Sequence, residues 1–447
     1  AGVGTGIPDA LHRWRVARLQ EMGSNAWRSA HNPPATALLD ACDEMGMLMI
    51  CEQRINSSSP EALWELERMI RRDRNHPSVI LWSLGNEEHG HQSTERGARI
   101  NAELQAHVRR LDPTRPTTFA MDQGWDNGVG RVVDVLGFNY RTDQIEAYHH
   151  RHVEQPVIGT ETGSTVATRG EYANDPARHV VRAYDTEHPW WATTAEEWWT
   201  IAADRPYIAG GFVWTGFDYR GEPTPYDEWP SISSQFGILD TCGFPKDNFY
   251  YYRAWWRPHQ PLVHLLPHWN WAGREGQAIE VWTHGNTDEV ELRLNGRSLG
   301  RKRMPRNRHL VWSVPYAPGR IEATGYNGGR VAARDMRETS GPPHTVRLTV
   351  DRRISKSGEV AIANAQVVDG RGRFVPNADN MLRFAVAGGT VIGVGNGNPN
   401  SLEPDVASER RAFNGLAQAI VRVGRGPVAI SVMSDGLAGS RIKIMGL

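Results

Sequence analysis

The chain has 447 residues and a mass of 50.0 kDa, with 50 Lys and Arg residues against 51 Asp and Glu residues. This length exceeds what one hydrophobic core usually organises, so we expect two or three domains. A formal net charge of -1 gives no electrostatic case for binding nucleic acid or an anionic membrane surface. No apolar run approaches the roughly 20 residues of a membrane span. On these two grounds, charge and span length, we expect neither nucleic acid nor a membrane as a partner.

Two uncommon residue types narrow the chemistry further. Cys42, Cys51 and Cys242 form no even-numbered disulfide framework and lack the pair spacing of a zinc site. The chain contains 17 Trp, whose flat apolar rings suit the C–H faces of sugars, although core packing accounts for such rings equally well. A small neutral ligand is favoured, and the cellular compartment stays open.

Helical and strand patterns alternate from residue 8 to about residue 256. Amphipathic helices are predicted at residues 12–22, 35–45, 61–72, 95–111 and 195–205. Strands are predicted at residues 25–28, 48–52, 79–83, 117–120, 133–139, 157–161 and 210–215. This alternation and a length near 250 residues predict an α/β fold, a TIM (β/α)8 barrel that forms a catalytic domain over residues 1–256.

The barrel pattern contains seven strands, and a helix comes before the first of them. A barrel that lacks one strand leaves backbone N–H and C=O groups unpaired along its open edges. We therefore expect the first barrel strand, and further parts of the protein, to lie upstream of residue 1.

After about residue 257 the pattern changes to alternating apolar and polar residues broken by Gly, Asn and Pro. Such a pattern is typical of antiparallel sheets with hairpins. A Pro-rich joint at Ser340, Gly341, Pro342 and Pro343 divides this region. We predict two all-β, immunoglobulin-like sandwich domains, one over residues 257–340 and one over residues 341–447.

Two predicted barrel strands end in a carboxylate: the strand from Val79 runs to Glu87, and the strand from Val157 runs to Glu161. An apolar strand that ends in an ionisable group places that group at the C-terminal mouth of a barrel, where barrels carry their chemistry. Hydrolysis of a glycosidic bond needs one protonated carboxyl group and one ionised carboxylate on opposite faces of the sugar. The pair therefore indicates a glycosidase, whereas one such Glu alone is explained as well by a helix cap or an ion pair.

Several segments resemble glycoside hydrolase family 2. They are Ser83-Leu84-Gly85-Asn86-Glu87-Glu88, Asn139-Tyr140, Gly159-Thr160-Glu161, Arg28-Ser29-Ala30-His31-Asn32-Pro33 and residues 212–223. The resemblance implies that Glu87 is the acid/base and Glu161 the nucleophile of a retaining mechanism. It also implies that Arg28 and His31 line the sugar site, that the strand before residue 215 supplies an aromatic platform, and that further domains precede the barrel.

The neighbours of the two carboxylates have physical roles of their own. The Asn86 amide can hydrogen-bond the sugar 2-hydroxyl, a bond that strengthens in the oxocarbenium-like transition state. The Tyr140 hydroxyl can donate to the nucleophile and keep it ionised, and the Arg28 charge acts in the same direction. A rim ion pair is the competing account of Arg28, and a satisfied loop histidine that of His31.

Three residues of the last predicted strand and the loop after it complete the predicted substrate site. Trp214 offers a ring for stacking, with core packing as the alternative. Asp218 and Glu222 follow in a loop rich in Gly and Pro, where each either bonds sugar hydroxyls or fixes the turn.

No cofactor and no catalytic metal are expected. The segment from Cys51 to Asn56 lacks the Glu and His that supply a magnesium site in the metal-dependent members of the family, and Ser164 stands where those members have a His after the nucleophile. His89 and His91 are the nearby imidazoles, without a matching carboxylate spacing.

The resulting hypothesis is a retaining exo-glycosidase that removes terminal β-D-galactosides by double displacement, with a β-galactoside as its substrate partner. A β-glucuronidase is the main alternative within the family, but the Asn-x-Lys motif that binds the substrate carboxylate in such relatives is not found after Glu161. A non-catalytic carbohydrate-binding protein is the alternative from another class. The aglycone, the linkage and the existence of a homo-oligomer stay open.

Overall fold

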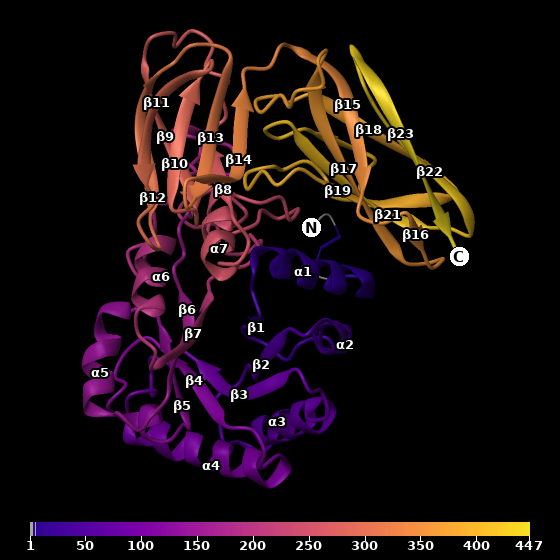
Figure 1. Ribbon diagram of the computed structural model, residues 1–447. Coiled ribbons are helices and arrows are strands. Elements are labelled where there is room, and N and C mark those ends of the chain that lie inside the picture. Colours follow the sequence, from indigo (N-terminus) through magenta and orange to yellow (C-terminus); the bar gives the residue numbers. More distant parts are fainter. Residues whose placement is uncertain (1–2, 5) are drawn as a thin grey trace. The chain divides into compact units, whose positions relative to one another are not determined.

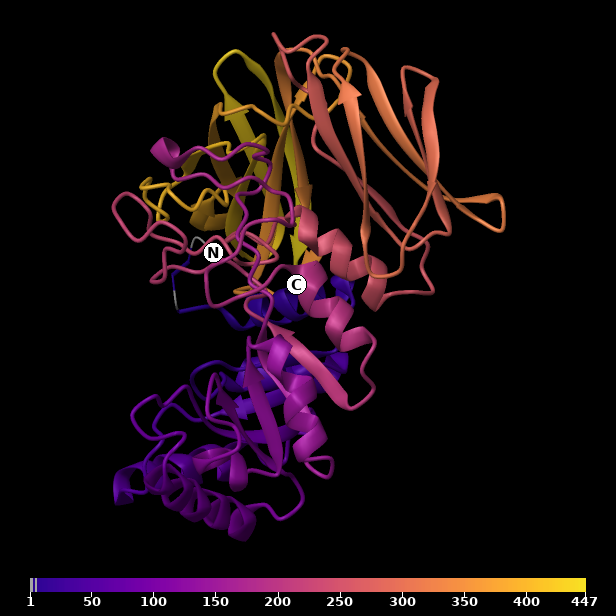
Figure 2. The same ribbon diagram turned by 90° about the vertical axis from the view of Figure 1, so that its left-hand side faces the viewer.

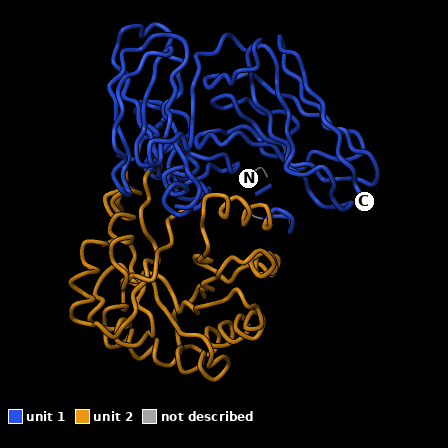
Figure 3. The backbone as a smooth tube through the Cα atoms, viewed as in Figure 1, with its two compact units in different colours: residues 1–11, 166–187, 216–447 blue, residues 12–165, 188–215 orange. Residues whose placement is uncertain are grey.

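The computed structural model describes residues 3–4 and 6–447. These residues divide into two compact units (Figure 3). One, which we call the barrel unit, holds residues 12–165 and 188–215. The other, the β-rich unit, holds residues 1–11, 166–187 and 216–447. Among the described residues, no helix has the length and apolar character needed to cross a bilayer.

The centre of the barrel unit is one parallel sheet in which each strand pairs with the next one along the chain (Figure 1). Within the described residues it has seven strands: β1 (Ala26–Arg28), β2 (Leu48–Glu52), β3 (Val79–Asn86), β4 (Thr117–Met121), β5 (Val135–Asn139), β6 (Val157–Thr162) and β7 (Ile208–Val213). This order and direction are those of a TIM barrel, so the predicted fold class is confirmed. The predicted upstream strand stays a prediction.

Helices follow most of these strands, as a βα alternation requires. They are α2 (Thr36–Met45), α3 (Pro60–Asp73), α4 (Glu95–Leu111), α5 (Ile145–Arg151) and α6 (Ala195–Ala203), while α1 (Asp9–Met22) precedes β1 and α7 (Asp247–Trp256) lies in the β-rich unit. Short 3-10 turns occur at Gly128–Arg131, Thr142–Gln144 and Pro176–Arg178. The sequence pattern missed α5 and α7. Helix α5 has only 7 residues, which is too short for a periodic signal.

Local sequence signals explain where several helices begin. Ser59 accepts a hydrogen bond from the Ala62 N–H at the start of α3, and Thr94 does the same for Gly97 at the start of α4. Thr194 begins α6 with a reciprocal capping box to Glu197. These bonds satisfy N–H groups that have no partner within the helix.

The sheet packs tightly against α6 because two strands carry glycine there. A Cβ atom on Gly211 would lie 2.0 Å from the Trp198 ring, and one on Gly159 would lie 2.9 Å from it. The indole therefore occupies the space that side chains would otherwise take. Trp198 is almost fully buried, so at this Trp core packing outweighs any role in sugar binding.

The first half of the β-rich unit forms two antiparallel sheets. One has β12 (His309–Pro315), β9 (Ala278–Gly285) and β8 (Val263–Leu266), and the other has β11 (Arg297–Arg303), β10 (Glu289–Leu294), β13 (Arg320–Asn327) and β14 (Arg330–Glu338). Alternate residues such as Val290, Leu292 and Ile321 are buried in a common core with Trp269 and Trp312. This is the packing of a β-sandwich.

The second half is a larger set of strands with a core rich in Val and Ala. It contains β15 (Pro343–Val350), β16 (Ile354–Ser355), β17 (Val360–Asp369), β18 (Met381–Ala387), β19 (Gly389–Gly395), β20 (Glu409–Arg411), β21 (Leu416–Val423), β22 (Gly426–Ser434) and β23 (Leu437–Gly446). The all-β character predicted for the tail is confirmed, and the Pro-rich joint follows β14, with Pro343 as the first residue of β15. The domain boundaries at residues 256 and 340 stay predictions.

Between β7 and α7 the chain forms no long element. Residues 216–246, in the β-rich unit, are mostly coil with isolated bridges such as that between Phe217 and Leu239 (Figure 2). The predicted substrate residues Asp218 and Glu222 lie in this stretch.

Candidate active site

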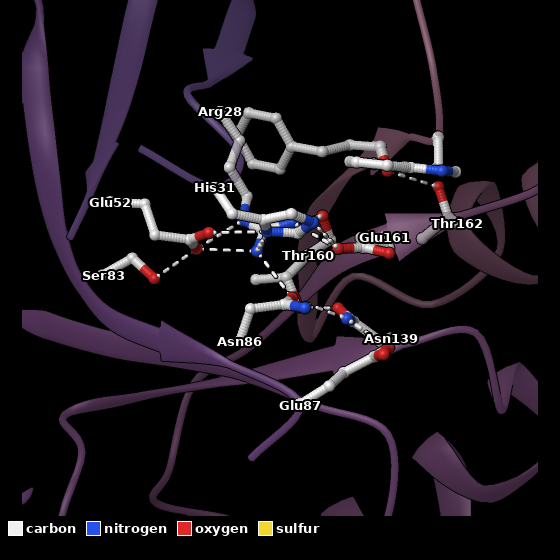
Figure 4. A network of polar contacts seen from close by, with 12 residues as sticks. Arg28, His31, Glu52, Ser83, Asn86, Glu87, Asn139, Thr160, Glu161 and Thr162 are labelled. Atoms are coloured by element: carbon white, nitrogen blue, oxygen red, sulfur yellow. Dashed lines mark hydrogen bonds and ion pairs between the residues drawn. The ribbon is translucent and has the colours of Figure 1, made fainter. Parts of the chain in front are cut away.

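The ends of the parallel strands in the barrel unit gather polar side chains. Arg28 is the last residue of β1 and Glu52 the last of β2. Glu87 directly follows β3, Tyr140 directly follows β5, and Glu161 lies near the end of β6. Parallel strands have their C-terminal ends on the same edge of the sheet, so the fold brings these five residues together. We call this cluster and its hydrogen-bonded neighbours the catalytic mouth (Figure 4).

The chain turns sharply as it leaves β3. Gly85 has a φ of 156°, and a Cβ atom there would lie 2.9 Å from the Phe119 ring. Glu87 has a φ of 50°, in the left-handed region that costs free energy for a residue with a side chain. A backbone bond of 2.9 Å from the Glu87 N–H to the Ala120 carbonyl helps to hold this conformation. The strained turn aims the Glu87 side chain along the edge of the sheet, towards Asn139.

Arg28 connects three strand ends through all the donors of its guanidinium. The Nε and Nη2 groups donate to Glu52 Oε2 at 2.9 and 2.6 Å. Nη2 also donates to Asn86 Oδ1 at 2.8 Å, while Nη1 donates to Glu161 Oε1 at 2.8 Å and to the Thr160 carbonyl at 3.2 Å. A guanidinium has five N–H groups in a fixed plane, so these bonds fix its position completely. Arg28 is buried, and its pairing with two carboxylates raises its pKa despite the opposing effect of burial.

Glu161 has a cation on one oxygen and a phenol on the other. Its Oε1 accepts from Arg28, and the His31 Nε2 atom lies 3.8 Å from the same oxygen. Its Oε2 accepts from the Tyr140 hydroxyl at 2.7 Å. Burial and the charge of Glu161 raise the pKa of Tyr140 well above its usual value, so the phenol keeps its proton and stays a donor. Arg28 and the Tyr140 hydroxyl thus occupy both carboxylate oxygens of Glu161.

Two amides, those of Asn86 and Asn139, link Arg28 and Thr160 to Glu87. Asn139 donates through Nδ2 to Asn86 Oδ1 at 3.0 Å and to Glu87 Oε1 at 2.8 Å, and its own Oδ1 accepts from Thr160 Oγ1 at 2.7 Å. Because Arg28 also donates to Asn86 Oδ1, this oxygen faces the protein. The Asn86 Nδ2 group is thereby turned away from both donors and can bond a substrate hydroxyl.

Glu87 and Glu161 have different electrostatic surroundings. Burial and, after it, the negative charge of Glu161 raise the pKa of Glu87 to about 7. Glu161, in contrast, lies beside the Arg28 guanidinium. Glu87 thus keeps part of its proton near neutral pH, while Glu161 is held by a guanidinium and a phenol. A proton donor beside a second carboxyl group is what acid-catalysed displacement at a sugar requires.

His31 and Trp214 form one wall beside Glu161. Their rings are stacked with centroids 5.2 Å apart and an angle of 24° between the planes. His31 Nδ1 bonds Glu52 Oε1 at 2.9 Å. The Trp214 backbone carbonyl accepts from Ser164 Oγ at 2.6 Å, which ties the end of β7 to the segment that follows β6. His31 and Trp214 therefore lie together with the catalytic mouth, as the predicted sugar-binding roles require.

Asp218 and Glu222 lie in the β-rich unit, and their contacts there are internal. Asp218 is buried, with Oδ2 2.7 Å from Lys246 Nζ and Oδ1 accepting from the Gly237 N–H at 2.7 Å. Glu222 accepts a hydrogen bond from the Tyr219 hydroxyl. These bonds match the turn-fixing alternative for both residues. Their substrate-binding roles stay predictions.

Several polar residues of the catalytic mouth have no role predicted from the sequence. Glu52 and Asn139 are completely buried, and Ser83 and Thr160 donate to them. Glu52 did have a signal, because it is the third acidic residue placed at the end of a predicted strand. Asn139 stood next to Tyr140 in the resemblance but received no role.

One group of possible metal ligands occurs among the described residues. A carboxylate oxygen of Glu87, an imidazole nitrogen of His89 and a carboxylate oxygen of Asp122 all lie within 4.8 Å of one another. His89 Nε2 and Asp122 Oδ2 are 2.9 Å apart and pair with each other. Nothing else in the structure points to a cation there, and the expectation of metal-free catalysis stays a prediction.

Comparison with known protein families agrees with the fold. The family description "Glycosyl hydrolases family 2, TIM barrel domain" matches residues 2–65 and 56–229. "Glycoside hydrolase family 2 C-terminal domain 5" matches residues 346–443, and a domain of unknown function matches residues 276–333.

Individual proteins show the same similarity. A β-galactosidase of Bacteroides ovatus is 36% identical, with 95% of this chain and 58% of that protein aligned. A β-glucuronidase of Bacteroides fragilis is 28% identical, with 70% of this chain and 48% of that protein aligned. The crystal structure of a β-glycosidase from Bacteroides vulgatus has a TM-score of 0.88 and 32% identity, and the match covers 99% of this chain and 62% of that one. The chain thus spans about half to three-fifths of the length of these proteins.

Proposed function

The chain belongs to glycoside hydrolase family 2, and we propose that it carries the catalytic centre of a retaining exo-β-galactosidase. The observation that carries the proposal is the pairing of two carboxyl groups with different surroundings. Glu87 has a pKa raised to about 7, while Glu161 receives bonds from Arg28 and Tyr140. A carboxyl group that can donate a proton near neutral pH, beside a second carboxyl group held by a guanidinium and a phenol, is what double displacement at an anomeric carbon requires.

In the first step, Glu161 attacks the anomeric carbon and Glu87 gives its proton to the departing glycosidic oxygen. This forms a covalent glycosyl-enzyme and releases the aglycone. In the second step, Glu87, now a carboxylate, takes a proton from water, and that water displaces Glu161 from the sugar. We expect the two carboxyl groups to lie about 5–5.5 Å apart, as retention of configuration requires.

The other residues of the catalytic mouth have roles in this scheme. Asn86 Nδ2 donates to the sugar 2-hydroxyl, where the bond strengthens as the oxocarbenium-like charge develops. Trp214, backed by the stacked His31 ring, offers an apolar face to the C–H groups of the sugar. Arg28 and Tyr140 hold Glu161 in line for attack.

The scarcity of Lys after Glu161 favours galactosides over glucuronides. A glucuronidase needs a cation for the substrate carboxylate, and Lys246 is the one Lys between Glu161 and the end of α7. Its side chain is only 2% exposed and pairs with Asp218 at 2.7 Å, so it has no free charge to offer. The similarity to the Bacteroides ovatus β-galactosidase also supports this choice, whereas the similarity to the Bacteroides fragilis β-glucuronidase keeps the alternative in the test.

A panel of nitrophenyl glycosides that differ only in the sugar tests the substrate. We expect the highest kcat/KM for the β-galactoside and at least a tenfold lower value for the β-glucuronide, because an unpaired carboxylate in a polar site costs more than 1.4 kcal/mol. A higher kcat/KM for the glucuronide would replace the galactosidase proposal with its rival.

The variant Glu161→Gln tests whether the chain is an enzyme at all. It removes the nucleophile but keeps the side chain's shape, so kcat should fall by at least about 10⁴-fold. Glu154→Gln, an exposed Glu shortly before the same strand, is the matched control and should keep parental rates. Equal rates for Glu161→Gln and the parent would favour a non-catalytic carbohydrate-binding protein.

A further inference from the structure

A third carboxylate, Glu52, lies behind the two that perform the reaction. It is completely buried at the end of β2, and all its close contacts are with the protein. Its Oε2 accepts from Arg28 Nε, Arg28 Nη2 and Ser83 Oγ at 2.9, 2.6 and 2.7 Å, and its Oε1 bonds His31 Nδ1 at 2.9 Å. Both oxygens are occupied, so Glu52 is not placed to touch a substrate.

Glu52 stays ionised in spite of its burial. Burial alone would raise its pKa, but the charge of Arg28 and the bonds from His31 and Ser83 outweigh burial and lower it. A buried carboxylate without such partners would be strongly destabilising. The charge is therefore maintained by the same residues that form the catalytic mouth.

Glu52 bonds two side chains, Arg28 and His31, and the same two side chains approach Glu161 Oε1. Arg28 Nη1 lies 2.8 Å from this oxygen and His31 Nε2 lies 3.8 Å from it (Figure 4). Arg28 is thus shared between two carboxylates, one that reacts and one that does not. Glu52 has no direct contact with Glu161 and can act on it only through these two side chains.

We propose that Glu52 is a positioning residue for the nucleophile, which fixes Arg28 and His31 and shares the Arg28 charge with Glu161. This assignment rests on the proposed double displacement. Sharing the Arg28 charge matters because a carboxylate paired with a whole guanidinium charge is a poorer nucleophile than one whose guanidinium is also paired with a second carboxylate. With Glu52 ionised, Arg28 orients Glu161 without neutralising it fully.

Glu52 also determines the orientation of the His31 ring. An ionised carboxylate can only accept a hydrogen bond, so the Nδ1 atom of His31 carries the proton between them. The Nε2 atom is then directed to Glu161 and the sugar, with the ring stacked on Trp214. A bond of this kind selects which ring nitrogen meets the substrate.

The competing account is that Glu52 only stabilises the fold. Loss of one partner of a buried ion pair is destabilising in any protein, so a lower yield or a lower Tm does not separate the two accounts. The separating measurement must report on the nucleophile itself. The pH dependence of kcat/KM and its dependence on the leaving group both do so.

The experiment uses Glu52→Gln in the full-length protein with phenyl and 2,4-dinitrophenyl β-galactosides. We expect kcat/KM to fall about 100-fold, the usual cost of a small misplacement of a catalytic group. The fall should be equal for the two substrates, because the nucleophile acts on both alike. The acidic limb of the kcat/KM profile should move to lower pH, because the undivided Arg28 charge favours the ionised nucleophile.

Two further variants serve as comparisons for the kinetics of Glu52→Gln. Glu87→Gln should slow the phenyl substrate much more than the dinitrophenyl substrate, whose leaving group needs little protonation. Asp112→Asn removes another buried carboxylate of the barrel unit, one that bonds Trp82 and Arg115 before β4 begins. It should lower Tm without changing the pH profile. If Glu52→Gln does not fold, Ser83→Ala removes one bond to Glu52 and should lower kcat/KM about fivefold for both substrates.

An active parent whose Glu52→Gln variant keeps the acidic limb and stays within twofold of the parental kcat/KM overturns the assignment and leaves the proposed function intact. A Glu52→Gln variant that behaves like Glu87→Gln overturns it as well. A parent without activity on any aryl glycoside overturns both the assignment and the proposed function.

Discussion

Buried charge occurs in both units of the molecule, but it is arranged differently in each. In the barrel unit, Arg28 pairs with Glu52 and Glu161, while Glu87 and Asn86 at the same strand ends are only partly buried. In the β-rich unit, Asp218 pairs with Lys246, and Asp240 with Arg169. The second set resembles the first in burial and distances.

The difference lies in what remains for a ligand. Asp240 uses Oδ2 for Arg169 and Oδ1 for the N–H groups of Cys242 and Phe244. Asp218 and Lys246 likewise use their atoms on each other, on the Gly237 N–H and on the Gln235 carbonyl. In the catalytic mouth, Asn86 Nδ2 makes no hydrogen bond to any of the described residues. Buried charge therefore marks a reactive site only where part of the network stays open.

The largest effect on activity should come from replacing Glu87, the proposed acid of the catalytic mouth. Glu87→Gln removes the proton donor, so kcat/KM for a phenyl β-galactoside should fall about 10³-fold to 10⁴-fold. Steady-state kinetics measure this, with Glu88→Gln, the adjacent glutamate, as the matched control expected to stay near parental rates. A loss of similar size in both variants would mean that position, rather than acid chemistry, is what the first substitution removed.

Breaking the closed network should affect stability instead. Lys246→Met leaves the Asp218 carboxyl group, whose pKa burial raises to about 7, without its partner, which should cost about 3–5 kcal/mol of unfolding free energy above that pH. Denaturant unfolding measures this, and the double variant Lys246→Met, Asp218→Asn should recover part of the loss. Should Asp218→Asn also raise KM several-fold while the double variant stays stable, Asp218 would regain the substrate role predicted for it.

The electrostatic asymmetry of the two carboxylates predicts a pH dependence. Glu87 must be protonated to act as the acid, and its pKa is raised to about 7, so kcat/KM should fall about tenfold per pH unit above that value. The sign follows from the raised pKa, since the acid form is present below it. A pH profile for the phenyl substrate checks this, and Glu87→Gln should lose the basic limb. A flat profile up to pH 9 would contradict the assignment of Glu87.

The smallest effect should come from a helix cap that lies outside both networks of buried charge. Ser59→Ala removes the cap of α3 and should cost about 1 kcal/mol of stability. Thermal unfolding should show a lower Tm, while kcat/KM stays unchanged. A change in kcat/KM would mean that α3 transmits strain to the strand ends.

The barrel could be predicted closely because its signals are local. Apolar runs and helical periodicity identified β2 and α4 at their observed bounds, and seven parallel strands appear in the expected order. The apolar run alone placed β3 at residues 79–83, whereas the strand continues to Asn86, next to the Glu87 at which the carboxylate pattern ended it. The reason is Gly85, which usually ends strands but here permits close packing against Phe119.

The candidate site was only partly predictable. Arg28, His31, Asn86, Tyr140 and Trp214 lie with Glu87 and Glu161 in the barrel unit, as strand-end positions indicated. Glu52 and Asn139 were missed because their importance consists of bonds to residues that are distant in sequence. No spacing in the chain shows that Arg28 will use its donors on three other strands.

The sequence by itself determined which residues end the strands, and with them the two carboxylates and the family. The tertiary structure alone decided how these residues divide the charge among themselves. Strand ends are fixed by apolar patterning that any short segment carries within itself. The pKa of Glu87, the sharing of Arg28 and the closure around Asp218 depend instead on burial and on distances of a few ångströms between segments that only the fold brings together.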